Sequence, residues 1–319
     1  MSADCRIAQI ACAARFQREK RAVKKTTLFK QYLLDKEILL IPVAHDPLGA
    51  KIVQRAGFKV VGCAGYANSA ALMGVPDIEI LTLTNMVDCV WRMCDAVDLP
   101  VWADGDNGHG NVTNVQMTVR QMEKAGAASI MLEDQVSPKR CGHMSGKHVV
   151  PADEFIAKIK AGVDARQDQD FTILARTDAV AVNGLQDAVD RAHRAIEAGA
   201  DWVFLEAPEN IDQMREIPKL VSKPTLANMI PGGKTPIVPA AELQSIGFAA
   251  VVWPNAFTYA YAKIATELAK ELLRTGSTAS YDSRMIEFEE FNELVGLPKI
   301  RETEESYYSE LEHPHLRGA

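Results

Sequence analysis

The sequence predicts an α/β fold, a (β/α)8 barrel of the TIM type, on three observations. Eight short apolar runs recur along the chain, as expected for buried parallel strands. Stretches with helical periodicity and a charged outer face separate the runs, which indicates helices covering a sheet. Glycines precede every second run, at Gly57, Gly126, Gly199 and Gly247. Glycine at such places is typical of a chain that leaves a helix and turns into the next strand.

The expected strands follow one another at regular intervals. They span residues 38–44, 59–65, 101–106, 128–134, 172–178, 202–207, 225–230 and 249–255. The expected helices between them include 113–124, 152–166, 185–198 and 210–217, the last ending before Pro218. An open doubly wound sheet is the alternative, but no Gly-x-Gly-x-x-Gly pattern follows the first run. Eight βα units that close into a barrel are therefore expected.

Both ends of the chain extend beyond the predicted barrel. Residues 257–275 are expected to form the closing helix, and residues 276–281 a linker. An apolar stripe then follows within 284–294, formed by Met285, Phe288, Phe291 and Leu294. The stripe would pack on a neighbouring subunit or dock at the end of its own barrel. This predicts a basic N-terminal extension (1–30), a barrel domain (31–275) and a C-terminal helical arm (276–319).

Composition limits the classes of protein that the chain can belong to. Of the 319 residues, 47% are hydrophobic and 24% charged, which excludes a disordered chain. Residues 1–30 hold eight Lys/Arg and two Asp/Glu, which leaves 27 basic and 40 acidic residues, a net −13, in the rest. This balance argues against a nucleic-acid partner. No uninterrupted apolar run reaches the roughly 18 residues of a membrane span.

Cysteine usage and the N-terminal order of residues predict the compartment. The six cysteines show no Cys-x-x-Cys pairing, as expected for reduced thiols in the cytoplasm. In residues 1–30 an apolar run at 7–14 precedes the basic residues, the reverse of a secretory signal. A mitochondrial transit peptide is the alternative to an extra surface helix. We expect a cytoplasmic protein.

Acidic residues end four successive predicted strands. They are Asp104 and Asp106, then Glu133 and Asp134, then Asp178, then Glu206. The carboxyl ends of barrel strands share one mouth, where such acids would repel each other unless a cation or an arginine offset them. A hard divalent ion, Mg²⁺ with Mn²⁺ as an alternative, fits carboxylates without a His/Cys cluster. Helix capping or salt bridging would account for any one of these acids, but poorly for all four ends.

A basic segment with a cysteine, Lys139-Arg-Cys141-Gly142-His143, follows the fourth predicted strand. Its flanking positive charges are expected to lower the thiol pKa and let Cys141 exchange protons near neutrality. An incidental surface thiol is the alternative, but loops carry function often enough to favour a catalytic acid/base.

These residues, in this order, resemble a known family. Asp104-Gly-Asp106, Glu133-Asp-Gln, the Lys139–His143 segment, Ala-Arg176-Thr-Asp178 and Leu-Ala-Asn228-Met are similar to motifs of the isocitrate lyase/phosphoenolpyruvate mutase superfamily. The similarity is greatest to its methylisocitrate lyase, dimethylmalate lyase and carboxyphosphoenolpyruvate mutase branch, and covers roughly residues 38–297. It implies a barrel, Mg²⁺ and a homotetramer in which C-terminal helices are exchanged.

The resemblance also implies roles for individual residues. Asp104 would hold Mg²⁺ directly, and Asp106 and Glu133 mostly through waters. Lys139, Cys141 and His143 would lie on a mobile loop, whose small residues Gly142, Ser145 and Gly146 suit movement. Oxygens of a small carboxylate substrate would contact Arg176, Glu206 and Asn228. The implied reaction cleaves the C2–C3 bond of a 2-hydroxy di- or tricarboxylate, and Cys141 protonates the departing enolate.

The chain departs from the lyases at two places near the expected substrate. Ala64 replaces the usual Ser or Thr before Gly65, and Tyr66 adds bulk after it. Ile230 and the following proline replace a Thr/Ser-Glu or Val-Glu pair. A missing donor costs about 1–3 kcal/mol, so we expect a substrate smaller or less charged at its distal end than methylisocitrate. The predicted substrate contacts are Ala64, Gly65, Tyr66, Gly142, Asn228, Ile230 and Trp253.

Three functions compete at this point. A carbon–carbon lyase that releases a 2-oxo acid such as pyruvate is favoured, because it needs an acid such as Cys141 at the carbanion. A phosphonate-forming mutase is the first alternative. A barrel that has lost catalysis and serves as a binding or scaffold protein is the second.

Overall fold

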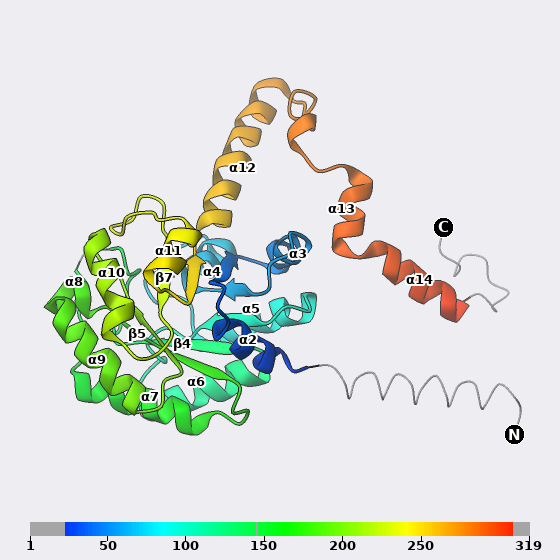
Figure 1. Cartoon of the computed structure of the whole chain (residues 1–319). Coiled ribbons are helices and arrows are strands. Elements are labelled where there is room, and N and C mark those ends of the chain that lie inside the picture. Colours follow the sequence, from blue (N-terminus) through cyan, green and yellow to red (C-terminus); the bar gives the residue numbers. More distant parts are fainter. Residues whose placement is uncertain (1–22, 145, 309–319) are drawn as a thin grey trace, which may run out of the picture.

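The computed structural model describes residues 23–144 and 146–308, and within them it forms a barrel with a projecting C-terminal arm (Figure 1). The expectations for residues 1–22, for Ser145 and for residues 309–319 lie outside these ranges. Eight parallel strands follow the order β6-β5-β4-β3-β2-β1-β8-β7. They are β1 Leu39–Ala44, β2 Val61–Cys63, β3 Val101–Asp104, β4 Ser129–Glu133, β5 Thr172–Thr177, β6 Trp202–Leu205, β7 Leu226–Asn228 and β8 Ala250–Trp253.

The strand ring closes between β6 and β7. A parallel bridge joins Val203 to Thr225, and the Val203 amide donates to the Pro224 carbonyl at 3.0 Å. Each of the eight predicted apolar runs contains one strand, so the barrel prediction is confirmed. The apolar runs predicted the strands correctly, because parallel strands that are buried on both faces have continuous apolar sequences.

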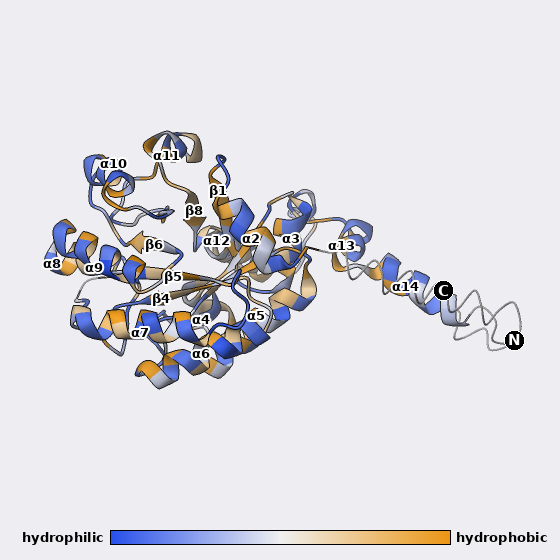
Figure 2. Cartoon of the chain, turned by 60° about the horizontal axis from the view of Figure 1, so that its bottom comes forward, coloured by the Kyte–Doolittle hydropathy of each residue, from blue (hydrophilic) through white to orange (hydrophobic). Residues whose placement is uncertain are grey.

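Helices surround the strands, and most of them carry both hydrophilic and hydrophobic residues along the ribbon (Figure 2). They are α3 Pro47–Arg55, α4 Gly65–Met73, α5 Leu83–Ala96, α6 Val112–Lys124, α7 Ala152–Ala165, α8 Ala179–Asn183, α9 Leu185–Glu197, α10 Ile211–Leu220 and α11 Ala240–Ile246. Gly247, which ends α11, has φ +114°, as expected of a glycine that turns the chain toward a strand. Helix α10 continues through Pro218, so the expected end at residue 217 was wrong. Pro218 lies in the last turn, where buried Ile217 and Met214 hold the helix against the barrel.

A short helix, α2 Lys25–Leu33, closes the end of the barrel where the strands begin. Phe29 is fully buried and meets the Trp202 ring edge-on, with the ring centroids 5.7 Å apart. The Lys25 ammonium donates to the carbonyls of Cys94 at 3.1 Å and Val97 at 2.7 Å, which ties α2 to the end of α5. The boundary placed at residue 30 therefore cuts through a helix that belongs to the barrel core.

We expect Phe29→Ala to destabilise the fold by about 3–5 kcal/mol, because it leaves a cavity among the barrel side chains. Urea unfolding followed by circular dichroism measures this loss. Leu34→Ala is the control, since Leu34 follows the same helix and is 65% exposed. Equal unfolding midpoints for both variants would contradict the role of α2 as a barrel plug.

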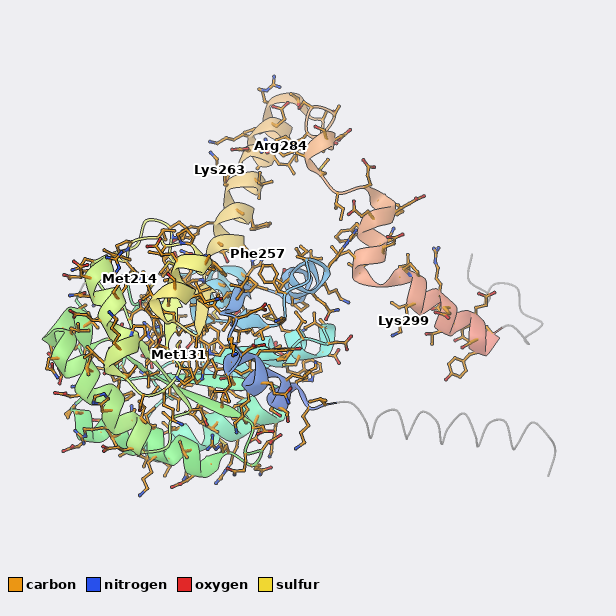
Figure 3. The ribbon with its side chains drawn as sticks, viewed as in Figure 1. Met131, Met214, Phe257, Lys263, Arg284 and Lys299 are labelled. Atoms are coloured by element: carbon orange, nitrogen blue, oxygen red, sulfur yellow. The ribbon has the colours of Figure 1, made fainter. Side chains whose placement is uncertain are left out.

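The C-terminal arm leaves the barrel along helix α12 Ala256–Thr275, none of whose residues is buried. A 3₁₀ turn (Asp282–Arg284), α13 Phe288–Val295 and α14 Leu297–Tyr308 follow. Figure 3 shows Lys263, Arg284 and Lys299 on this arm, far from Met131 and Met214 in the barrel body. The helix expected from residue 284 begins only at Phe288, because Met285 has extended backbone.

Helix α13 returns to the barrel and lies against α3 of the same chain. Arg55 and Glu290 form an ion pair at 2.8 Å beside an apolar gap lined by Ile52 and Phe291. Phe288 remains 80% exposed, so the apolar stripe is only partly covered within the chain. In the part of the chain that the structure describes, no helix has both the length and the apolar character needed to cross a membrane.

Candidate active site

A cavity of about 240 Å³ opens at the carboxyl ends of the strands. Ten residues predicted from the sequence line it: Ala64, Tyr66, Asp104, Cys141, Gly142, His143, Arg176, Glu206, Asn228 and Ile230. Trp253 does not line it. Its side chain packs with the helix-facing core, and its neighbours Val252 and Asn255 reach the cavity instead. The structure does not bring Trp253 to the cavity, because successive strand residues face opposite sides of a barrel wall.

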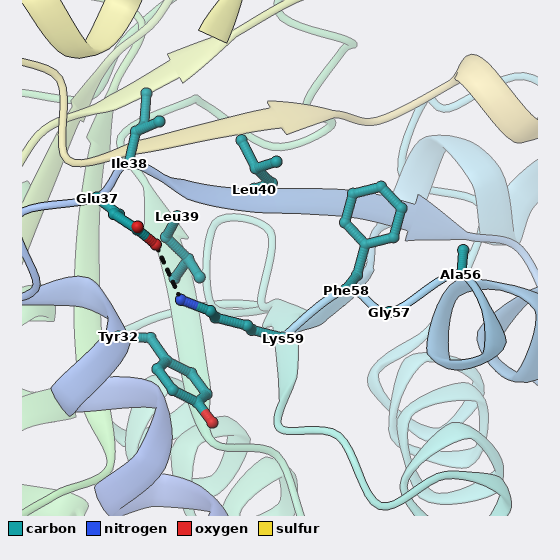
Figure 4. A pocket seen from close by; sticks show the side chains of 9 residues that line it. All are labelled: Tyr32, Glu37, Ile38, Leu39, Leu40, Ala56, Gly57, Phe58 and Lys59. Atoms are coloured by element: carbon teal, nitrogen blue, oxygen red, sulfur yellow. Dashed lines mark hydrogen bonds and ion pairs between the residues drawn. The ribbon is translucent and has the colours of Figure 1, made fainter. Parts of the chain in front are cut away.

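A second cavity, of about 330 Å³, lies at the opposite end of β1 and β2 (Figure 4). The Lys59 ammonium there lies 3.3 Å from Glu37 and 5.5 Å from the centre of the Tyr32 ring, and Leu40 and Phe58 supply apolar walls. Its one acid and one lysine already pair with each other. The cavity at the carboxyl ends, with its many polar groups, is therefore the candidate active site.

The first group in the site is a set of carboxylates around one lysine. The Lys139 ammonium lies 2.6 Å from Asp77 and 2.7 Å from Asp106. Asp104 accepts from the Gly65 amide at 3.0 Å and from the Asp106 amide at 3.0 Å. Gly65 fits closely here, because a Cβ would lie 3.2 Å from the Lys139 ammonium and 3.3 Å from each of Asp104 and Asp106, so those side chains would have to shift. Gly65 thus places the acids rather than contacting the cavity.

Burial controls the protonation of this group. It raises the pKa of Asp106 to about 7, although Lys139 opposes the shift. Burial also disfavours charge on Lys139, but Asp106, Asp77 and Asp104 together raise its pKa well above the ordinary value. Asp106 has φ +49°, a strained conformation for a residue other than glycine. Charge and backbone strain are thus concentrated where β3 ends.

The second group is centred on Arg176, at the end of β5. Its guanidinium lies 2.9 Å from Asp178, 3.3 Å from Glu133 and 3.4 Å from Glu206. Burial opposes its charge, yet these three carboxylates raise the pKa of Arg176 well above its usual value. An arginine therefore offsets much of the repulsion among the strand-end acids.

Two of the strand-end acids have structural partners. Arg191 lies 3.2 Å from Asp134, and Lys147 lies 2.6 Å from Asp178. For these two acids, salt bridging is the role that the structure shows.

The loop after β4 brings Cys141, Gly142 and His143 against the Arg176 group. His143 Nδ1 accepts from the Lys234 amide at 2.9 Å, and its Nε2 lies 3.0 Å from Glu206. A Cβ on Gly142 would lie 2.5 Å from the Arg176 Nη2 atom, so only glycine lets the loop approach this closely. Asn228 completes the wall, donating to Glu206 at 3.1 Å.

The pKa of the Cys141 thiol is raised, whereas the sequence led us to expect a lowered pKa. Burial raises the pKa of Cys141, and the negative charges of Asp77 and Glu206 add to the shift. The neighbouring Lys139 cannot lower it, because its ammonium is engaged by two carboxylates. Cys141 is therefore a protonated thiol at neutral pH, suited to donate a proton.

The carboxylates at the ends of β3 and β4 fit a hard divalent cation. Asp104, Asp106 and Glu133 offer only oxygen ligands, which Mg²⁺ prefers. Glu133 Oε1 is buried without a hydrogen-bond partner, and burial raises the pKa of Glu133 well above its usual value. Within residues 23–144 and 146–308, no three His, Cys, Asp or Glu side chains converge on one point. An ion here would need waters to complete its coordination.

Sequence reasoning missed residues that lie outside the strand ends. Asp77 and Glu79 come from the segment after α4, and Lys147 from the end of the loop. Glu79 accepts from the Lys139 amide at 2.6 Å and from the Ser137 hydroxyl at 2.9 Å, and it has φ +63°. No periodicity marks this segment, and only Gly74, which ends α4, signals that the chain turns there.

A (β/α)8 barrel with an acid-lined mouth, a buried arginine and a Lys-Arg-Cys-Gly-His loop defines the class of phosphoenolpyruvate mutase/isocitrate lyase barrels. Comparison with known proteins agrees: the family described as phosphoenolpyruvate phosphomutase matches residues 29–273. The chain belongs to the phosphoenolpyruvate mutase/isocitrate lyase superfamily, and the resemblance inferred from its motifs is confirmed.

Individual relatives include lyases and a mutase. The chain is 44% identical to 2,3-dimethylmalate lyase of Eubacterium barkeri over 87% of its own length and 96% of the relative's. It is 40% identical to the chloroplastic carboxyvinyl-carboxyphosphonate phosphorylmutase of Arabidopsis thaliana, over 95% and 93%. Among solved structures, a phosphonopyruvate hydrolase in complex with oxalate and Mg²⁺ superposes with a TM-score of 0.81 at 28% identity, covering 90% of this chain and 100% of that one. The chain is thus an enzyme of this superfamily.

Proposed function

We propose that the chain is a Mg²⁺-dependent carbon–carbon lyase that acts on a 2-hydroxy dicarboxylate of the 2-alkylmalate kind. The observation that carries the proposal is Cys141, a protonated thiol that lines the same cavity as Arg176 and Asn228. Cleavage of a C–C bond creates a carbanion and needs such an acid, whereas phosphoryl transfer does not. The identity to a dimethylmalate lyase supports the same reading.

Each residue of the site has its own role in the proposed reaction. Arg176 and Asn228 bind the substrate's carboxylate and hydroxyl oxygens, and Asp77 in the cavity wall accepts the proton of the C2 hydroxyl. The C2–C3 bond then breaks, C2 becomes the carbonyl of a 2-oxo acid such as pyruvate, and the electron pair remains on C3 beside its carboxylate. The Cys141 S–H bond supplies the proton that C3 takes up. Mg²⁺ held by Asp104, with Asp106 and Glu133 acting through waters, would supply Lewis-acid stabilisation of the developing charge.

A panel of 2-hydroxy di- and tricarboxylates with Mg²⁺, assayed for 2-oxo acid release, tests the proposal. Release from a 2-alkylmalate is the expected result. A mutase is the second candidate, because the mutase relative matches 95% of the chain. A ³¹P spectrum after incubation with phosphorylated pyruvate derivatives distinguishes the two. A new carbon–phosphorus signal without 2-oxo acid release would replace the lyase proposal.

The cavity wall predicts a preference for a small distal group. Ala64 offers no hydroxyl donor, and the Tyr66 and Tyr259 hydroxyls lie 2.9 Å apart across the cavity mouth. We expect kcat/KM for a 2-alkylmalate to exceed that for 2-methylisocitrate at least tenfold, the cost of one missing donor. Ala64→Ser should reduce this ratio about fivefold, while Ala70→Ser, exposed on the helix α4 that Ala64 precedes, should not. Comparable kcat/KM values of the unmodified enzyme for the 2-alkylmalate and for 2-methylisocitrate would contradict the preference for a small distal group.

Assembly and location remain proposals. We propose a homotetramer with exchanged C-terminal arms, supported by an α12 that buries none of its residues and by the 91% exposure of Leu273. Light scattering should give the mass of four chains, and a monomer would contradict this. The cytoplasmic location expected from the cysteines stays a prediction.

A further inference from the structure

Lys147 is a buried lysine whose role neither the sequence nor the proposed chemistry explains. Its side chain is only 2% exposed, although a charged ammonium strongly prefers water. The ammonium has two partners: the carboxylate of Asp178 at 2.6 Å, and the carbonyl of Gly142. One partner belongs to the barrel and the other to the loop.

The barrel partner is itself bound to the substrate arginine. Asp178 is fully buried, accepts from Arg176 Nε at 2.9 Å and from Arg176 Nη2 at 3.2 Å, and its amide donates to Asp134 at 2.9 Å. Burial alone would raise the pKa of Asp178, but Arg176 and Lys147 hold it at about 2. Asp178 is therefore a fixed negative charge shared by Arg176 and Lys147.

The loop partner is adjacent to the proposed acid. Gly142 follows Cys141 and packs directly on Arg176 and Glu206. The loop is pinned at its base by a Gln135–Val149 bridge, and Val136 donates to the His148 carbonyl at 2.9 Å. Lys147 lies next to this base, so its bonds hold the far part of the loop against the barrel.

From this geometry we propose that Lys147 is a positioning residue that holds the Cys141 loop over the cavity by joining the Gly142 carbonyl to Asp178. The position of the acid Cys141 is thereby tied to that of Arg176. The consequence for catalysis rests on the proposed lyase function, whereas the consequence for loop position does not.

Alkylation of Cys141 by iodoacetamide, followed by peptide mass spectrometry on the full chain without substrate, tests the loop position. We expect Lys147→Met to react about tenfold faster than the unmodified protein, because the released loop exposes the thiol. Lys25→Met is the matched control, since the Lys25 ammonium also has two hydrogen-bond partners, both carbonyls, but at the opposite end of the barrel. Equal alkylation rates for a folded Lys147→Met and the unmodified protein would overturn the proposal.

Kinetics supply the second readout. With a substrate that the unmodified enzyme cleaves, Lys147→Met should lower kcat by about 100-fold, because a misplaced acid slows the chemical step. KM should stay within about threefold. An equal fall of kcat in Lys25→Met would assign the effect to lost stability and overturn the proposal. If Lys147→Met gives no cooperative melting transition, Lys147→Gln, which keeps an amide donor, replaces it.

The two readouts separate the proposals. Absence of 2-oxo acid release by the unmodified enzyme from every substrate would reject the lyase function. The alkylation rates would still decide whether Lys147 holds the loop.

Discussion

Replacement of Cys141 by alanine should lower the rate of 2-oxo acid release by about 10³-fold. The alanine has no proton to give to the carbanion, and no other thiol lines the cavity within the described residues. Because burial raises the pKa of Cys141, the unmodified enzyme should keep its acid form to higher pH than an exposed cysteine would, and lose activity as the thiol ionises. Steady-state kinetics of both proteins across pH measure this.

Cys89→Ala is the control, because Cys89 is a half-buried thiol on α5 that does not line the cavity. The rise in melting temperature on addition of Mg²⁺ should be the same in Cys141→Ala and in the unmodified protein, since Cys141 is not one of the proposed metal ligands. Full activity of Cys141→Ala would refute the assigned proton donor.

Replacement of Asp104 by asparagine should lower activity by a similar factor, about 10³-fold, through loss of the metal. Asparagine keeps the size of the side chain and can still accept from the Gly65 amide, so the local fold should persist. It lacks the negative charge that a divalent cation requires. The Mg²⁺-dependent rise in melting temperature should therefore disappear in Asp104→Asn.

Chelation is an independent way to obtain the enzyme without a bound metal ion. The unmodified enzyme treated with EDTA should lose activity and recover it when Mg²⁺ is restored, whereas Asp104→Asn should change little. Asp98→Asn, an exposed position before β3, is the matched control. Activity that survives both chelation and Asp104→Asn would exclude a metal-dependent reaction.

The strands and the acids at their ends could be predicted from the sequence, because both depend on local pattern. A buried parallel strand must be apolar throughout, and the residue that ends it faces the mouth of the barrel. Asp104, Glu133 and Glu206 were found in this way, whereas Arg176 came from the family resemblance. Their partners were not, since Asp77 and Lys147 come from irregular segments where no periodicity indicates direction.

Cys141 shows a second limit of sequence reasoning. Its basic neighbours in the sequence suggested a positive field that would lower the pKa of the thiol. Residues that are adjacent in the sequence, however, need not direct their side chains to the same place. Lys139 turns toward Asp77 and Asp106, and the thiol faces buried carboxylates instead. The direction of a pKa shift therefore depends on burial and on side-chain direction, which a linear motif does not contain.

Helix α2 closes the end of the barrel where the strands begin, and the candidate active site lies at the other end. Phe29 fills the α2 end of the barrel, and Lys25 fastens the helix to the end of α5. The cavity opens at the carboxyl ends of the strands. Lys25, the first residue of α2, therefore lies on the barrel face opposite the candidate active site. An immobilising surface attached to the α2 face of the barrel should leave substrate entry unobstructed, which makes the α2 face the practical attachment point for the assays above.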